Sequence, residues 1–473
     1  MVKAIAAVSV LLLWTTEVNA QYVPPTPNII FIVPDDLTEK SFTGTDASGT
    51  PFMPYLAAKK MEARRFENFI FTQSMCVPSR TTYLTGQYPH NHGVTNNGGP
   101  EGGYDRYMEK GLDQVSFPNL LSDYYSAHLG KFLNNYPKAD WPAIPAGWDY
   151  WLSIHKHNMM QMFNWTATEN DTVVTFSGAT DEIYQTNVIR DKVKELIQQQ
   201  SVYQMPYVMQ VASTSPHGPS QPSLQYTGLY ANEPFAPGMK PSFNEADKSD
   251  KVHQTPLFTT RQINKLTIQW RNSLESARSI DDMLQSLFQV LDETGQSAYT
   301  FVFFVPDNGK LWGEHGFTKK TVPYRESIKT TAIVWGPGVI PGVDRRLVAN
   351  IDVMPTFMEI AGKPIPASVD GRSLLPLLKG QPISWRKSVL VQGIAPADTE
   401  DGVLDTTGNA FSALISRNED FIEFDAGIEF YNVKNDPYQL NSVVPTPEAV
   451  QAYQQRIDAH YACAGETCRV ADQ

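Results

Sequence analysis

The chain has 473 residues, of which 41% are hydrophobic and 19% charged, and its 38 Lys and Arg against 50 Asp and Glu residues give a net charge of −12. This composition excludes a disordered or fibrous protein, and the length suffices for two or three domains of about 150 residues each. The sequence has no block of five or more Lys or Arg residues. It therefore gives no electrostatic basis for binding nucleic acid or an anionic membrane surface.

The first 20 residues have the pattern of a secretory signal peptide. Lys3 is followed by an apolar stretch from Ala4 to Trp14 and by the small-residue pattern Val18-Asn19-Ala20. Such a stretch is too short for a transmembrane helix, which needs about 20 residues. We therefore expect a secreted, extracellular protein, or alternatively a lysosomal one, that has no membrane span and starts near Gln21.

Because we expect the chain to be secreted, its N-glycosylation sequons and its cysteines are informative. Asn164 and Asn170 each begin an N-glycosylation sequon in a polar segment, which predicts a glycosylated surface loop. Cys463 and Cys468 are close enough in sequence to close a small disulfide loop, which leaves Cys76 alone. An unpaired thiol in an oxidising compartment is buried, paired with another chain, or chemically special.

Three short apolar segments predict buried strands, and each runs into polar residues. They are 28–33 before Asp35 and Asp36, 207–212 before His217, and 301–305 before Asp307 and Asn308. Apolar residues at spacings of three and four predict helices over about 181–199 and 263–291, the second ending near Gly295. Helices that alternate with buried strands indicate an α/β sandwich around a mainly parallel sheet, where ligands gather at the carboxyl ends of the strands.

Two other regions bear on the domain organisation. Residues 219–256 are polar, proline-bearing and aperiodic, and we expect them to form a surface wall of the substrate cleft. Near residue 381 the pattern changes to short alternating segments and a helical tail, at 388–391, 412–416, 421–424 and 447–461. We therefore predict a catalytic domain over 21–380 and a smaller α+β domain with an antiparallel sheet over 381–473.

The sharpest local signal is Cys76-Val77-Pro78-Ser79-Arg80, followed by Leu84-Thr85-Gly86. Pro78 suits the first turn of a helix and Gly86 suits its end, so Cys76 should lie at a helix N-terminus, where free N–H groups favour an anion. Arg80 adds a positive charge one turn later. These residues predict a site that holds an anion beside an unusual cysteine.

C-x-P-S-R followed by L-T-G resembles the signature of the type I sulfatases, which include arylsulfatases and N-acetylglucosamine-6-sulfatases and belong to the alkaline phosphatase-like superfamily. The resemblance covers about residues 27–440 in the family's order. Its further segments are Pro27–Phe31 with Asp35 and Asp36, Gly130–Asn134, Asp307–Gly309, Gly313–Gly316, Lys320 with Tyr324, Gly336–Gly338, Asp370–Leu377 and Asn435–Tyr438. It implies the alkaline phosphatase-like sandwich and hydrolysis of the sulfate monoester of a small molecule or a carbohydrate.

The resemblance also implies a chemistry. In this family the equivalent of Cys76 is converted to formylglycine (3-oxoalanine) by the formylglycine-generating enzyme, and its hydrate is the nucleophile. A simple alkoxide would remain esterified, whereas the second hydroxyl of the hydrate can expel sulfate. The resemblance assigns a divalent metal to Asp35, Asp36, residue 76, Asp307 and Asn308, and these hard oxygen ligands favour Ca²⁺, with Mg²⁺ as the alternative.

The remaining roles follow from the same resemblance. Arg80 and Lys131 would supply positive charge, and His217 and Lys320 would contact the sulfate or protonate the leaving oxygen. His315 and Asn134 would bind substrate. Leu133 occupies a position where many sulfatases have histidine, as in the subgroup with glucosamine-6-sulfatases and secreted arylsulfatases.

Each of these residues also has a structural interpretation. The two aspartates after the first strand could cap a helix, Asp307–Gly309 could be a simple turn, and His217 could be an ordinary loop histidine. Lys320 or its neighbour Lys319 could be solvated, and we prefer Lys320 because of its spacing to Tyr324. We interpret the pair His90 and His92 as packing residues.

The sequence therefore leaves three candidate functions for this protein. A secreted sulfuric ester hydrolase is favoured by the complete set of motifs. A phosphate or phosphonate ester hydrolase on the same scaffold would use the same cations, and a non-catalytic glycoprotein would only bind sulfated glycans. Nothing in the sequence distinguishes an aryl sulfate from a sulfated sugar as the substrate.

Overall fold

A computed structural model describes residues 26–137, 143–245, 251–252, 255–393, 410–443 and 445–473. The predicted signal peptide lies outside the described residues. Within these ranges, no helix combines the length and the apolar character that a membrane crossing requires.

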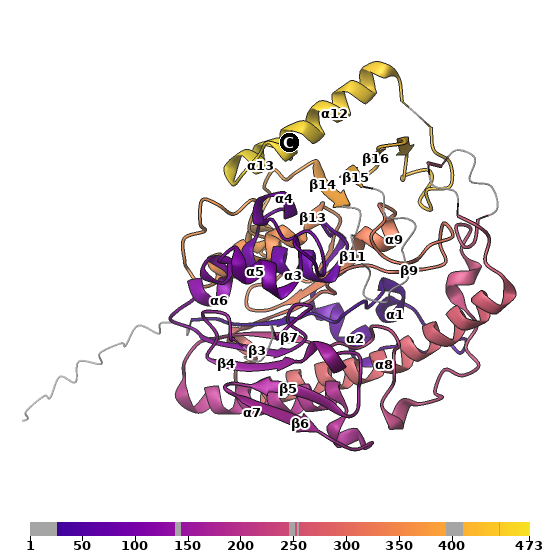
Figure 1. The fold of residues 1–473 in the computed structure, drawn as a ribbon. Helices are drawn as coiled ribbons and strands as arrows, with labels where there is room; N and C mark the ends of the chain where they lie inside the picture. Colours follow the sequence, from indigo (N-terminus) through magenta and orange to yellow (C-terminus); the bar gives the residue numbers. More distant parts are fainter. Residues whose placement is uncertain (1–25, 138–142, 246–250, 253–254, 394–409, 444) are drawn as a thin grey trace, which may run out of the picture.

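A large sheet runs through the centre of the molecule (Figure 1). Within the described residues it has 11 strands in the order β12-β2-β11-β8-β1-β7-β3-β4-β5-β6, with β13 beside β2. Their bounds are β1 Asn28–Ile32, β2 Arg64–Ile70, β3 Tyr125–Gly130, β4 Tyr150–Ile154, β5 Trp165–Glu169, β6 Thr172–Phe176, β7 Tyr207–Ala212, β8 Thr300–Phe304, β11 Lys329–Trp335, β12 Gly342–Asp344 and β13 Val348–Ala349. The neighbours β8, β1, β7, β3 and β4 are parallel, while β11 and β5 run antiparallel to the strands beside them. The predicted α/β class is confirmed.

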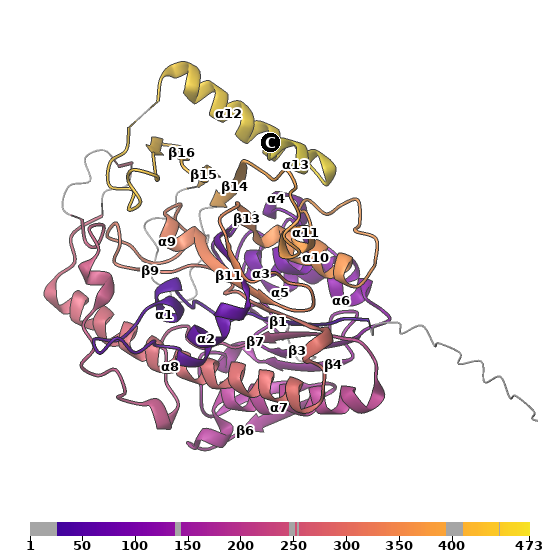
Figure 2. The same ribbon diagram turned by 180° about the vertical axis from the view of Figure 1, so that it is seen from behind.

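Helices cover both faces of this sheet because its central strands are apolar on both sides (Figures 1 and 2). Ile29 and Phe31 of β1 belong to the core on one face, and Ile30 and Ile32 belong to the core on the other. The first face is covered by α3 Cys76–Thr85, α5 Gly103–Glu109, α6 Phe117–Leu120 and α10 Val353–Ile360, and the second by α2 Pro54–Lys59, α7 Gln185–Tyr203 and α8 Thr260–Glu293. The sheet is thereby the middle layer of a sandwich.

Both long helices of the sequence prediction are present, but both ends of the first one differ from the prediction, since α7 spans Gln185–Tyr203. Helix α8 starts at a capping box formed by Thr259 and Gln262. Helix α7 starts at Gln185 rather than near Asp181. The reason is that Asp181 lies in a separate 3-10 turn, where its carboxylate accepts hydrogen bonds from the backbone amides of Leu224 (2.6 Å) and Gln225 (3.0 Å).

A second sheet follows the main one in sequence. In the described part of the tail it is antiparallel, with β14 Ser388–Gly393, β15 Phe411–Ser416, β16 Asp420–Phe424 and β17 Gly427–Tyr431. Helices α12 Pro447–Tyr461 and α13 Glu466–Ala471 follow, and α12 lies across this sheet in Figure 1. The antiparallel sheet is confirmed, although β17 was not predicted, and the boundary at residue 381 stays a prediction.

Buried charges attach the tail to the main sheet region. Arg386 donates to both carboxylate oxygens of Asp352 at 2.6 Å, and its Nε lies 3.0 Å from Asp472, the penultimate residue. All three side chains are fully buried. Cys463 and Cys468 form a disulfide between α12 and α13.

The described chain also contains shorter helices and strands. They are α1 Glu39–Thr43, α4 Pro89–His92, α9 Arg325–Ile328, α11 Leu375–Leu378, β9 Leu311–Trp312 and β10 Thr318–Lys319. The described part of segment 219–256 contains the 3-10 turns η5 Leu224–Tyr226 and η6 Ala236–Met239. Residues 246–250 and 253–254 of that segment lie outside the described residues.

Candidate active site

Four neighbouring parallel strands deliver polar side chains to one edge of the sheet. Because β8, β1, β7 and β3 are adjacent and parallel, the residues that follow them meet at their carboxyl ends. These residues are Asp307 and Asn308 after β8, Asp35 and Asp36 after β1, His217 after β7, and Lys131 after β3. The strand pairing thus explains why residues far apart in sequence form one cluster.

Helix α3 brings Cys76 to this edge. Met75 is the extended N-cap, so Cys76 is the first residue of the helix, and Gly86 ends it with φ of +68°. The side chain of Asn97 accepts a hydrogen bond from the backbone amide of Val77 at 2.9 Å, which satisfies one free donor at the helix start. The helix position predicted for Cys76 from Pro78 and Gly86 is therefore the one observed.

Cys76 is completely buried and carries a free thiol. Lys320 Nζ lies 2.8 Å from its Sγ, and Asp35 Oδ1 lies 3.6 Å away. Burial, together with the charge of Asp35, raises the pKa of the Cys76 thiol far above its usual range, although Lys131 and Lys320 act in the opposite direction. The sulfur is thus held as a neutral thiol, which is a poor nucleophile.

Asp36 is the most densely contacted carboxylate of the cluster. Its oxygens lie 2.5 Å from Lys320 Nζ, 3.3 Å from Lys310 Nζ and 3.5 Å from His217 Nε2. Asn308 Nδ2 donates to it at 2.7 Å. Burial alone would raise the pKa of Asp36, but Lys320, followed by His217 and Lys310, lowers it well below its usual range. Asp36 is therefore ionised at neutral pH.

Two further buried ion pairs complete the cluster. Lys131 Nζ lies 2.7 Å from Asp35, and Arg80 Nε lies 2.9 Å from Asp307. Burial opposes ionisation of Asp35, yet Lys131 and then His217 and Arg80 lower its pKa far below the usual value. The pKa of Asp307 is raised, by burial and by the nearby charge of Asp35. Three carboxylates are thus crowded together, and they need positive charge to remain ionised together.

The donor set fits a hard divalent cation. Ligand atoms of Asp35, Asp36, Cys76 and His217 all lie within 4.8 Å of one another. Asn308 Oδ1 is buried and has no hydrogen-bond partner within the described residues, so one oxygen at the same edge is left to accept a cation. Carboxylate and amide oxygens are the ligands that Ca²⁺ and Mg²⁺ prefer.

The two predicted substrate-binding residues stand apart from these contacts. His315 is fully buried, stacks on Tyr324 with ring centroids 4.1 Å apart, and has its Nδ1 3.4 Å from Glu245 Oε2. Asn134 is buried in the turn after β3, and neither of its side-chain amide atoms has a hydrogen-bond partner in the described part of the chain. The contacts described for these residues do not join them to Cys76, so their substrate roles stay predictions.

Lys310 was missed by the sequence analysis. Its Nζ contacts Asp36 and lies 4.6 Å from the ring centroid of Trp312. The signal was available, because Lys310 directly follows Asp307-Asn308-Gly309. It adds a cation at the border of the cluster.

The histidine pair of α4 has packing contacts. His92 Nδ1 accepts from the backbone amide of Val94 at 3.1 Å, and its Nε2 lies 3.1 Å from the hydroxyl of Thr82. His90 stacks on Tyr88. These contacts agree with a structural interpretation of both residues.

The asparagines of both sequons are exposed. Asn170 lies in the turn between β5 and β6, and Asn164 immediately precedes β5. Their positions are compatible with glycan attachment, which stays a prediction.

Comparison with known proteins identifies the family. The sulfatase family model matches residues 27–363, and the model described as N-sulphoglucosamine sulphohydrolase, C-terminal, matches residues 313–461. The human protein named N-acetylglucosamine-6-sulfatase is 29% identical over 94% of this chain and 86% of its own length. A putative extracellular sulfatase Sulf-1 homolog of Caenorhabditis elegans is 30% identical over 79% of this chain and 53% of its own length.

Solved structures share the fold. One, determined in complex with its substrate D-glucosamine-2-N,6-O-disulfate, has a TM-score of 0.73 at 21% identity and covers 91% of this chain and 96% of its own. The phosphonate monoester hydrolase of Silicibacter pomeroyi has a TM-score of 0.72 at 19% identity, covering 93% and 96%. At such identities these likenesses establish the architecture alone. The family match, which spans most of the chain, establishes more: this protein belongs to the sulfatase family and is a sulfatase of the alkaline phosphatase-like fold.

Proposed function

We propose that this sulfatase removes sulfate from 6-sulfated glucosamine residues of carbohydrates and uses Cys76, converted to formylglycine, as its catalytic residue. Several relatives, including the human protein, carry the name N-acetylglucosamine-6-sulfatase, and this supports the choice of a sugar over an aryl sulfate. Relatives named arylsulfatase are less similar, at 25% identity for the protein of Volvox carteri.

One contact carries the proposal. Lys320 Nζ lies 2.8 Å from Cys76 Sγ and 2.5 Å from Asp36, inside a cluster that also contains Lys131 and Arg80. Residue 76 is thus surrounded by cations in a buried site, although its own thiol is neutral. That environment suits a negatively charged substrate and a reacting oxygen at position 76 better than it suits a thiolate.

Formylglycine and a divalent metal are each assigned to the residues that fit them. Formylglycine at position 76 would supply a nucleophile that can release sulfate, and a Ca²⁺ ion held by Asp35, Asp36, Asp307 and Asn308 would lower the pKa of its hydroxyl and polarise the sulfate. Mg²⁺ is the alternative metal. We propose that the formylglycine-generating enzyme acts on the chain during export.

The chain's own cations have separable roles in this scheme. Arg80 is held by Asp307 and by the backbone oxygen of Lys131, to which it donates at 2.7 Å. The Lys131 ammonium is held by Asp35 at 2.7 Å. Lys131 and Lys320, which contact Asp35 and Asp36, would bind the sulfate oxygens. Fixed cations stabilise the charge that develops on the sulfate without reorganisation of solvent.

His217 is the candidate for the acid that protonates the leaving alcohol. Its Nδ1 lies 2.7 Å from the carbonyl oxygen of Gly218, so Nδ1–H donates to that oxygen and Nε2 faces Asp36 at 3.5 Å. In the imidazolium form, this orientation would leave the Nε2 proton available for transfer to the leaving alcohol, a function worth about 10²- to 10⁴-fold in rate. Asn134 and His315 are retained as proposed substrate contacts beyond the charged cluster.

We also propose that the chain is exported and acts outside the cell or in the lysosome. Relatives named extracellular sulfatase, the disulfide between Cys463 and Cys468, and the exposed sequon asparagines support this location. The proposed signal peptide is residues 1–20.

The test is a substrate comparison with protein produced in a secretory host that contains the formylglycine-generating enzyme. N-acetylglucosamine 6-sulfate and p-nitrophenyl sulfate should be hydrolysed, p-nitrophenyl phosphate and a phenyl phosphonate ester should be hydrolysed far more slowly, and Cys76→Ala should be inactive. Faster turnover of the phosphorus esters would replace the proposal by the phosphohydrolase alternative. Binding without turnover of any ester would favour the non-catalytic glycan-binding protein.

A further inference from the structure

The start of α3 depends on a residue from outside the helix. Met75, the N-cap residue, makes no side-chain hydrogen bond to the first turn. Pro78 has no N–H group, and the amide of Ser79 already donates to the carbonyl oxygen of Met75 at 3.0 Å. The amide of Val77 precedes this first intrahelical bond, and Asn97 Oδ1 accepts it at 2.9 Å. The cap of α3 is therefore supplied by Asn97, which lies 20 residues further along the chain.

Asn97 belongs to a tight loop, residues 95–103, that its own backbone holds closed. The amide of Asn96 donates to the carbonyl oxygen of Glu101 at 3.2 Å. At Gly102 a Cβ atom would lie 2.2 Å from the carbonyl oxygen of Asn96, so only glycine allows the two parts of the loop to approach this closely. The loop thus holds Asn97 in one place relative to its own backbone.

The same loop is attached to two segments of the candidate active site. In the turn before α3, the side-chain amide of Gln73 donates to the carbonyl oxygen of Thr95 at 2.6 Å, and Gln73 is only 3% exposed. Directly after the loop, the backbone amide of Tyr104 donates to the carbonyl oxygen of Asn134 at 2.8 Å. Asn134 lies in the turn that follows Lys131. The loop therefore connects the start of α3 to the turn that carries one of the cations.

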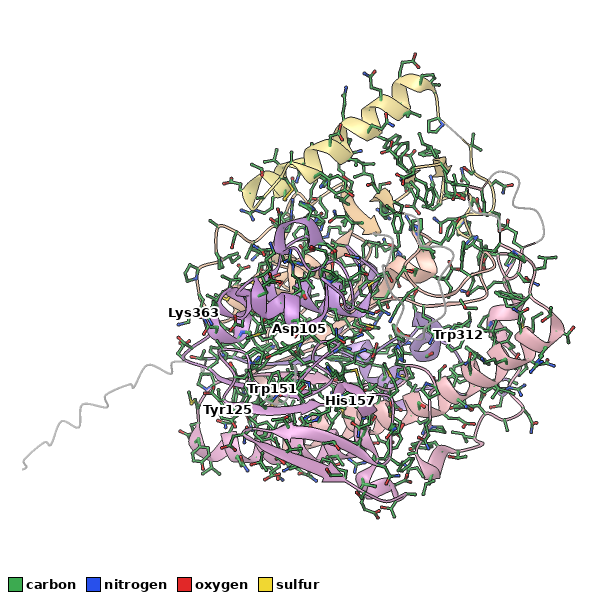
Figure 3. All side chains as sticks on the ribbon, in the orientation of Figure 1. Asp105, Tyr125, Trp151, His157, Trp312 and Lys363 are labelled. Atoms are coloured by element: carbon green, nitrogen blue, oxygen red, sulfur yellow. A yellow bond between two sulfur atoms is a disulfide. The ribbon has the colours of Figure 1, made fainter. Side chains whose placement is uncertain are left out.

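Cys76 is the first residue of the helix that this loop caps. Its Sγ lies 2.8 Å from Lys320 Nζ and 3.6 Å from Asp35 Oδ1, and these two contacts require one orientation of the side chain. The end of a helix frays, and its first turn frays more readily when a free amide lacks an acceptor. The loop continues into α5, which packs beside α3 and carries Asp105 in Figure 3.

We propose that Asn97 is a positioning residue for residue 76. Its hydrogen bond to the Val77 amide fixes the first turn of α3, and this turn directs the side chain of residue 76 toward Asp35 and Lys320. Asn97 acts through the helix backbone and does not touch the reacting atoms. The inference rests on the proposed function, because it takes residue 76 as the nucleophile. A displacement of a reacting group by about 1 Å can cost about 100-fold in rate.

The kinetic experiment uses p-nitrophenyl sulfate and expresses kcat per formylglycine, whose content in each preparation is measured by mass spectrometry. Asn97→Leu has a similar volume but no acceptor, and it should lower kcat about 10- to 100-fold while KM stays within about twofold. Asn97→Asp keeps an oxygen at that position and should retain kcat within about threefold of the native value. Thr446→Val is the matched control, because it removes the side chain that accepts from the Ala449 amide at the start of α12, and it should change neither constant. A native kcat in Asn97→Leu would overturn the proposal.

A labelling experiment needs no turnover and distinguishes the role of Asn97 from the proposed chemistry. In protein from a secretory host that lacks the formylglycine-generating enzyme, Cys76 keeps its thiol and is the cysteine outside the disulfide. Its thiolate displaces iodide from iodoacetamide and forms a C–S bond, and burial makes this reaction slow. Asn97→Leu should raise the labelling rate about tenfold, whereas Asn97→Asp and Thr446→Val should label at the native rate. An unchanged rate in Asn97→Leu refutes the positioning role. Absence of turnover in fully converted protein, with the tenfold labelling difference present, would refute only the proposed chemistry.

Discussion

The ammonium of Lys320 contacts both the Cys76 sulfur, at 2.8 Å, and the Asp36 carboxylate, at 2.5 Å. The two partners come from a helix start and a strand end, so this one side chain joins the candidate nucleophile to the candidate metal ligands. A lysine in that position can stabilise charge at residue 76 or on a sulfate bound beside it.

Lys320→Met should reduce kcat by at least about 100-fold, because it removes a cation from the reacting position. The neighbouring Lys319→Met is the matched control and should retain most of the activity. Steady-state kinetics with p-nitrophenyl sulfate measures both. If Lys319→Met were the inactive variant and Lys320→Met the active one, the assignment would have to be exchanged.

Calcium should stabilise the native protein and not merely activate it. A ligand that binds only the folded state adds about 2.7 kcal/mol to the free energy of unfolding at a concentration of 100 Kd. Asn308→Ala removes the buried oxygen that has no hydrogen-bond partner in the described structure and should weaken this effect. Urea unfolding with CaCl₂, MgCl₂ or a chelator provides the readout. Identical calcium stabilisation in both proteins would exclude Asn308 from the site.

Acid should destabilise the fold through two buried histidines outside the charged cluster. Burial lowers the pKa of His128 to about 3, and burial followed by the charge of His90 lowers that of His92 to about 3. In the unfolded chain histidine titrates near pH 6.5, so the contribution is complete above that pH and is lost progressively as the pH falls toward 3. At pH 4.5 the loss is about 3 kcal/mol for each histidine.

His92→Asn tests this directly, because the amide oxygen can replace Nδ1 as acceptor for the Val94 amide. The difference in free energy of unfolding between pH 7.5 and pH 4.5 should be smaller than that of the native protein by about 3 kcal/mol. An unchanged difference would show that His92 does not remain neutral in the fold.

The buried charge cluster of the tail should matter far more than an exposed ion pair. Arg386→Met leaves the buried carboxylates of Asp352 and Asp472 with less compensating charge, and should cost about 3–5 kcal/mol. Arg345→Met breaks an ion pair with Glu67 whose side chains are 62% and 37% exposed, and should cost less than about 1 kcal/mol. Equal midpoints of urea unfolding for the two variants would contradict this ranking.

The sequence predicted those site residues whose position follows from the direction of the strands before them. Asp35, Asp36, Asp307 and Asn308 each follow an apolar run, and parallel pairing requires such residues to meet at one edge. The position of Cys76 could be inferred for a similar local reason, since Pro78 and Gly86 define the helix that starts there.

The features that the sequence did not predict depend on contacts between distant residues, or on strands without a clear pattern of buried and exposed residues. Strand β6 has mostly exposed residues, and the tail cluster joins Arg386 to Asp352 and Asp472 across long stretches of chain. The start of α7 depended on the contact of Asp181 with residues 224 and 225. Lys310 was not predicted, although it adjoins a recognised motif. Its contact with Asp36 joins segments that follow two different strands, β8 and β1, and local sequence does not indicate such a contact.

The most direct test of the central claim is mass spectrometry of the peptide that contains Cys76, taken from protein purified out of the culture medium. We predict the loss of sulfur and two hydrogens and the gain of one oxygen at residue 76, together with an aldehyde that reacts with a hydrazide probe. An unmodified thiol at position 76 in protein that hydrolyses sulfate esters would contradict the account.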